Sequence, residues 1–109
     1  MLPHSAPVPL SAVYQTLAKV LTVTFDKLLK SLPTAAANWT GCLALAPASN
    51  VAGKAPGAAF EHTVTVPMAV GGPCFTPNWI TYAAVPADVV SRAGVPAAAF
   101  PNFPCNVVP

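Results

Sequence analysis

Three cysteines and two histidines are the side chains of this 109-residue sequence with the most specific chemistry. Cys42, Cys74 and Cys105 are odd in number and show no Cys-x-x-Cys spacing. A structural zinc site needs four ligands, and only His4 and His62 could complete a set with these cysteines. We therefore expect no metal site, and no residue pattern calls for a cofactor.

The cysteines can instead form a disulfide or remain reduced. Cys74 and Cys105 each lie in a proline-flanked segment, and we expect these two to be the bridged pair. Closing that loop would stabilise the fold by roughly 3–4 kcal/mol in the chain-entropy description. The alternative is that all three cysteines are reduced and pack as small apolar side chains.

Acid–base and nucleophilic chemistry have little support in the sequence. Glu61 and His62 are adjacent, but neighbours in a strand point to opposite faces and cannot act together as general acid and base. No spacing suggests a cysteine–histidine dyad that would use His62. We therefore expect that the protein is not an enzyme and that His62 is a partly buried core residue with one hydrogen bond.

Two short motifs also bear on function. Gly53-Lys54 resembles the end of a phosphate-binding loop, but Ala55 occupies the Ser/Thr position and residue 48 is not glycine, so we reject that site. Asn38 begins an Asn-Trp-Thr triplet, which is an N-glycosylation acceptor only in a eukaryotic secretory setting. The triplet leaves glycosylation open.

The strongest compositional signal is the scarcity of charge. Only eight residues are Asp, Glu, Lys or Arg, whereas a typical soluble chain of this length carries about 27. A chain of this mass exposes on the order of 5,700 Å², which leaves about 700 Å² for each charge. Exposed apolar patches of several hundred Å² usually mark contact surfaces, so we expect a subunit covered by neighbours. The alternative is a low-charge secreted protein.

Charge and hydropathy also argue against two classes of partner. The net charge is +2 and there is no basic run with interleaved aromatic residues, so we expect no nucleic-acid binding. Residues 63–87 carry no charge, but their prolines and glycines argue against a membrane-spanning helix. The N-terminus lacks the basic and apolar regions of a signal peptide.

Residues 60–86 are expected to form the centre of the fold. Apolar or aromatic residues and histidine alternate with mostly polar ones from Phe60 to Val70, as in a strand with one buried face. Gly71-Gly72-Pro73 breaks this run, and residues 78–85 predict a second strand. We expect the two strands to form a hairpin or to be neighbours.

The remaining elements are less clearly marked. Residues 10–32 fit either one amphipathic helix or a short helix near 11–18, a strand near 19–26 and a helical turn over 27–32, and we favour the second. Residues 41–46 predict a short strand, residues 47–59 a loop, and residues 86–94 a small helix.

Proline-rich segments flank the domain at both ends. Residues 1–9 and 95–109 are rich in proline and are expected to be extended arms around a single domain over 10–94. The C-terminal arm carries Phe100, Phe103 and Val107 as apolar side chains that we expect to bury against a neighbouring subunit.

We therefore predict a mainly β fold, a small sandwich or partial barrel with one or two short helices. An α+β fold is the runner-up. The expected function is that of a non-enzymatic structural or accessory subunit of a large assembly, such as a virion coat, decoration protein or surface layer. Its partners would be other protein subunits, in a virion or another extracellular assembly. The alternative is a secreted monomer that binds a small apolar ligand.

Overall fold

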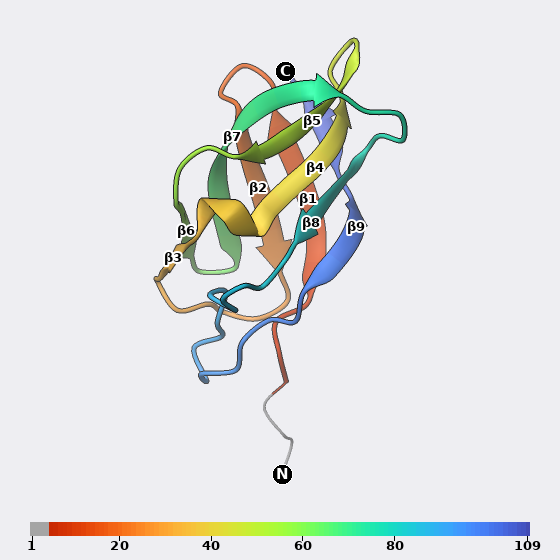
Figure 1. Ribbon diagram of the computed structural model, residues 1–109. Helices are drawn as coiled ribbons and strands as arrows, with labels where there is room; N and C mark the ends of the chain where they lie inside the picture. Colours follow the sequence, from red (N-terminus) through yellow and green to blue (C-terminus); the bar gives the residue numbers. More distant parts are fainter. Residues whose placement is uncertain (1–4) are drawn as a thin grey trace.

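A nearly closed, mixed β-sheet forms the body of the molecule (Figure 1). The computed structural model describes residues 5–109. Within them the strand order is β10-β1-β2-β7-β5-β4-β8-β9, and β6 and β3 extend the sheet beside β7. The strands are β1 (Pro9–Gln15), β2 (Val20–Phe25), β3 (Pro33–Thr34), β4 (Trp39–Ala44), β5 (Ala48–Gly53), β6 (Gly57–Phe60), β7 (Thr63–Pro73), β8 (Trp79–Tyr82), β9 (Phe100–Pro104) and β10 (Asn106–Val108). The mainly β, barrel-like prediction is confirmed.

Strand β7 forms one corner of the barrel. Its first half pairs with β2 and β6, and its second half pairs with β5. Val64, Val66 and Met68 are completely buried, which confirms the predicted alternation at the middle of the strand. The alternation fails at its ends: His62 is exposed, as are Phe60 and Val70. These three lie beyond the part of the strand that faces the barrel interior.

The C-terminal segment forms the second corner and closes the barrel. β9 pairs antiparallel with β8, and β10, one residue later, pairs in parallel with β1. The sequence predicted an arm laid on a neighbour, whereas these residues extend the chain's own sheet. Phe100 explains the difference, because its ring packs against those of Phe25, Trp39, Tyr82 and Phe103, with centroids 5.6–6.3 Å apart.

The predicted helices are wrong. Residues 9–25 form the antiparallel pair β1–β2, which confirms the strand near 19–26 and contradicts the helix near 11–18. The alternation of inward side chains, Ala12 and Tyr14 on β1 with Leu21 and Val23 on β2, prevails over the helical stripe. The helical element of residues 5–109 is one 3-10 turn, η1 (Ala36–Asn38). Among these residues no helix is long and apolar enough to cross a membrane.

Two further expectations need correction. The strand over 41–46 is confirmed as β4, but the segment over 47–59 contains β5 and most of β6, where a loop was expected. The two central strands are not neighbours, because β5 and β4 lie between β7 and β8. Residues 86–94 are irregular and are tied to the fold by the bridges Leu29–Ser91 and Val90–Pro96.

Side chains fill the interior of the barrel. Trp39, Tyr14, Tyr82 and Phe25 are its largest fully buried residues. The Tyr14 hydroxyl is buried without a hydrogen-bond partner in the described part of the chain, and burial raises the Tyr14 pKa. Because the interior is packed, a ligand or partner would have to bind on the outside of the sheet.

One carboxylate fastens a loop across an end of the barrel. Asp88 accepts hydrogen bonds from Thr34 Oγ1 at 2.7 Å, from the Ala35 N–H at 2.6 Å and from Asn38 Nδ2 at 3.1 Å. The Tyr82 hydroxyl lies 3.2 Å from the same carboxylate and accepts from the Asp88 N–H at 2.9 Å. Asp88 is therefore a structural residue that orders residues 83–91.

Candidate interaction face

The disulfide joins Cys42 of β4 to Cys74, with their Cα atoms 6.0 Å apart. The predicted Cys74–Cys105 pair is therefore wrong. Cys105 is a free, buried cysteine at the junction of β9 and β10, and burial raises its pKa to about 11. The sequence alone could not decide between a Cys42–Cys74 and a Cys74–Cys105 bridge. Cys74 comes close to Cys42 only because β5 and β8 lie on either side of β4 in the folded sheet.

The disulfide belongs to a set of contacts that hold residues 73–78 against β4 and β5. Asn50 Nδ2 donates to the Pro73 carbonyl at 3.2 Å, and the Cys74 N–H donates to the Ala48 carbonyl at 3.2 Å. At the other end of the loop, Asn78 Oδ1 accepts from the Ala44 N–H at 2.7 Å. A short loop with a covalent anchor and polar anchors at both ends has little freedom to rearrange.

This anchored loop presents an apolar side chain to solvent. Phe75 follows Cys74 directly and is 93% exposed, more than any other large apolar residue in the described part of the chain. A phenylalanine normally gains about 1.5–3 kcal/mol from full burial. Because the loop holds the Phe75 ring in solvent, this burial energy is not gained within one molecule. The exposed ring is therefore available to a partner.

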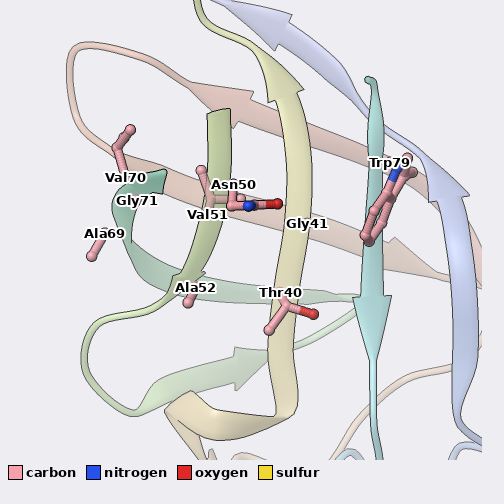
Figure 2. Close-up of a pocket in the computed structure, with 9 residues that line it drawn as sticks. All are labelled: Thr40, Gly41, Asn50, Val51, Ala52, Ala69, Val70, Gly71 and Trp79. Carbon is pink, nitrogen blue, oxygen red and sulfur yellow. The ribbon is translucent and has the colours of Figure 1, made fainter. Parts of the chain in front are cut away.

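A shallow groove of about 440 Å³ lies on the outer face of β4, β5, β7 and β8 (Figure 2), and its lining residue Trp79 directly follows the loop in the sequence. Figure 2 shows Trp79 at one side of the groove and Val70 at the other, with small side chains between them. The lining residues are Thr40, Gly41, Asn50, Val51, Ala52, Ala69, Val70, Gly71 and Trp79. We call this groove, together with Phe75, the apolar face.

Gly41 sets the distance between β4 and β8 at this face. A Cβ atom on Gly41 would lie 2.6 Å from the Trp79 carbonyl oxygen and 2.9 Å from Ile80 Cγ2. Both distances are too short for a side chain, so β8 approaches closely only because residue 41 is glycine. This close approach brings the Trp79 backbone next to Gly41, and both residues line the groove.

The apolar face is also uncharged. All eight charged residues lie in turns and loops, and no strand in the described part of the chain contains one. The total accessible surface is 5828 Å², close to the value expected for this mass. A folded surface of ordinary size thus has a very low density of charge, and the outer faces of the strands carry none of it.

The structure does not bring the predicted interaction residues into this face. Phe100, Phe103 and Val107 are partly buried against the chain's own core. Phe103 also lines a second hollow of about 390 Å³ between β1 and the C-terminal strands, together with Leu10, Ser11, Ala12, Pro104 and Asn106. These three side chains contribute to closure of the barrel.

The other candidate residues do not form a site. His62 is exposed, and its Nδ1 lies 3.2 Å from the Phe25 carbonyl oxygen. Asn38 is 1% exposed and its side chain binds Asp88, Pro86 and Val85, so it cannot accept a glycan in the folded protein. His4 lies outside the described residues. Within residues 5–109, no three potential metal ligands gather.

The residues of the apolar face had a weak signal in the sequence. The uncharged run over 63–87 contains β7, the Phe75 loop and Trp79. By sequence alone this run bears only on whether a helix crosses a membrane, and small residues such as Ala52 and Ala69 carry no signature of a groove. Comparison with protein-family models, with curated proteins and with solved structures gives no match to this chain.

Proposed function

We propose that this protein is a non-enzymatic structural or accessory subunit of a large assembly and that it attaches through the apolar face. The observation that carries the proposal is the exposed Phe75, held on a cross-linked loop beside an uncharged groove. Aromatic anchors that are rigid and apolar dominate the binding energy of many protein interfaces. The chain supplies such an anchor at the edge of its apolar face.

The uncharged strands support the same proposal. Interface cores are depleted in charged residues relative to the rest of a protein surface. An isolated soluble domain gains solubility from charged strand faces, whereas a face that is covered in an assembly has no need of them. A virion coat or decoration protein, or a subunit of another extracellular layer, fits this surface. The disulfide supports an oxidising setting.

The assembly proposal is tested on particles from the native source. They are purified by density gradient, and the chain is quantified by mass spectrometry against the major component. The proposal predicts that the chain sediments with the particles at a fixed stoichiometry through repeated gradients. Recovery of the chain only as a free 11 kDa protein would contradict it.

One observation favours a second candidate, a secreted monomer that binds a small apolar ligand. The groove volume of about 440 Å³ falls in the range of small-molecule sites. The packed interior places that ligand on the outside of the sheet, where less of its surface would be buried. Titration with anilinonaphthalene sulfonate tests this candidate: saturable binding by a monomer, lost in Ala52→Lys, would support it over the assembly subunit.

A further inference from the structure

The apolar face contains both a protruding side chain and a hollow that could receive it. Phe75 projects from the loop, and the groove begins beside the same disulfide: Cys42 is paired in register with Asn50 on one side and with Trp79 on the other. Both of these residues line the groove. The protrusion and the hollow therefore lie next to each other on one surface.

The Phe75 ring and the groove match in size and in apolar character. A cavity of about 150 Å³ lined by apolar side chains is sufficient to hold benzene. The groove, at about 440 Å³, has room for a phenyl ring against Trp79, and its small side chains leave the floor open. The anchored loop keeps Phe75 out of its own groove, where the ring would otherwise lose its exposure.

Electrostatics allow two copies to meet at this face. No strand of the described chain carries a charge that would repel an identical surface. When a protrusion and a hollow are adjacent, a two-fold axis between them lets each copy insert into the other.

We propose that a second copy of this chain covers the apolar face, with Phe75 of each copy seated in the groove of the other beside Trp79. This inference rests on the proposed function, because it names the partner that the face would contact. The contact between two copies is then the contact through which each chain joins the assembly.

Sedimentation equilibrium over a range of protein concentrations tests the dimer. Wild type is expected to be dimeric, and Phe75→Ser to weaken association about tenfold or more while circular dichroism stays unchanged. Phe60→Ser is the matched control, because Phe60 is 68% exposed and pairs with Thr63, at the opposite end of β7 from the groove-lining Val70. It should dimerise like wild type. Equal weakening by both variants, or a monomeric wild type, would overturn the proposal.

A mixing experiment distinguishes mutual insertion from general adhesion. Ala52→Lys blocks the groove but keeps Phe75, whereas Phe75→Ser keeps the groove. A mixture of the two should form heterodimers with one intact contact, which bind more tightly than either variant alone. The Trp79 emission should shift to shorter wavelength in that mixture, since Trp39 is already fully buried. No gain on mixing would refute reciprocal insertion.

The outcomes separate this inference from the proposed function. A monomeric wild type that still sediments with native particles refutes the second copy and leaves the assembly role intact. A Phe75-dependent dimer that never enters particles supports the second copy and refutes the assembly role.

Discussion

Cys42 in the middle of β4 is covalently joined to Cys74, 32 residues later, and this bond fixes the loop that presents Phe75. The bond holds Cys42, which is fully buried but lies outside the main cluster of core side chains. Its position links the stability of the fold to the shape of the apolar face, because the same loop leads into β8 and Trp79.

Reduction of this disulfide should lower the free energy of unfolding by roughly 3–4 kcal/mol, the loop-closure value for 32 residues. Urea unfolding with and without dithiothreitol measures the change. Cys105→Ala is the control, because it leaves the bridge intact and should remain sensitive to reduction. Non-reducing peptide mapping that links Cys74 to Cys105 would contradict the structure.

The β7 alternation predicts opposite effects at adjacent positions. Val64→Asp or Val66→Asp should unfold the domain, because each places an unpaired carboxylate at a fully buried site. Thr65→Asp should cost about 1 kcal/mol or less, because Thr65 is exposed between them. Thermal melts followed by circular dichroism compare the three. Equal damage at all three positions would show that β7 is not buried on one face only.

The C-terminal strands should be essential for folding. Deletion of residues 100–109 removes both β9 and β10, the aromatic contacts of Phe100, and the partners of β8 and β1. The truncated chain should lose its native circular dichroism spectrum, whereas deletion of Pro109 alone should have no effect. A shortened chain that melts like wild type would instead agree with the sequence-based prediction of a separate arm.

The N-terminal segment should loosen at low pH. Asp26 Oδ1 accepts from the Val8 N–H at 2.8 Å, and the Asp26 N–H donates to the Val8 carbonyl at 3.0 Å. The hydrogen bond from Lys27, followed by that from Val8, holds the Asp26 pKa below its ordinary 3.8. The anchor should thus be fully formed above that ordinary value and be lost as pH falls through the lowered pKa.

The Val8 amide shift in NMR spectra reports this step. Asp26→Asn should abolish the acid titration at Val8, because the variant has no carboxylate to protonate. A Val8 titration that persists in Asp26→Asn would assign the step to another group.

The sequence was most informative where burial follows a simple period. Val64, Val66 and Met68 alternate over a strand that pairs with β2, β6 and β5 and faces the barrel interior on one side, so local pattern and tertiary position agree. Residues 10–18 satisfy a helical stripe as well as an alternating one, and pairing with β2 decides between them. The sequence alone predicts that Phe100 is exposed on an arm. Its burial could not be foreseen, because its four aromatic neighbours are brought together only by the fold.

The apolar face was foreseeable only as a property of the whole surface. Charge scarcity predicts that some surface is covered, but it does not locate that surface. Locating it requires the strand order, which places β4 and β5 between β7 and β8 and brings Ala52 and Ala69 into register. Phe75 becomes conspicuous only when its loop is known to be cross-linked to β4.

Attachment of charged variants to the native assembly tests whether the protein binds through the apolar face. Ala52→Glu places a carboxylate in the groove, and Thr65→Glu places one on an exposed position of β7 away from it. Labelled proteins are mixed with particles from the native source, and the bound fraction is measured after gradient sedimentation. Wild type and Thr65→Glu should bind alike, and Ala52→Glu should remain unbound. Equal binding by Ala52→Glu and wild type would contradict attachment through the apolar face.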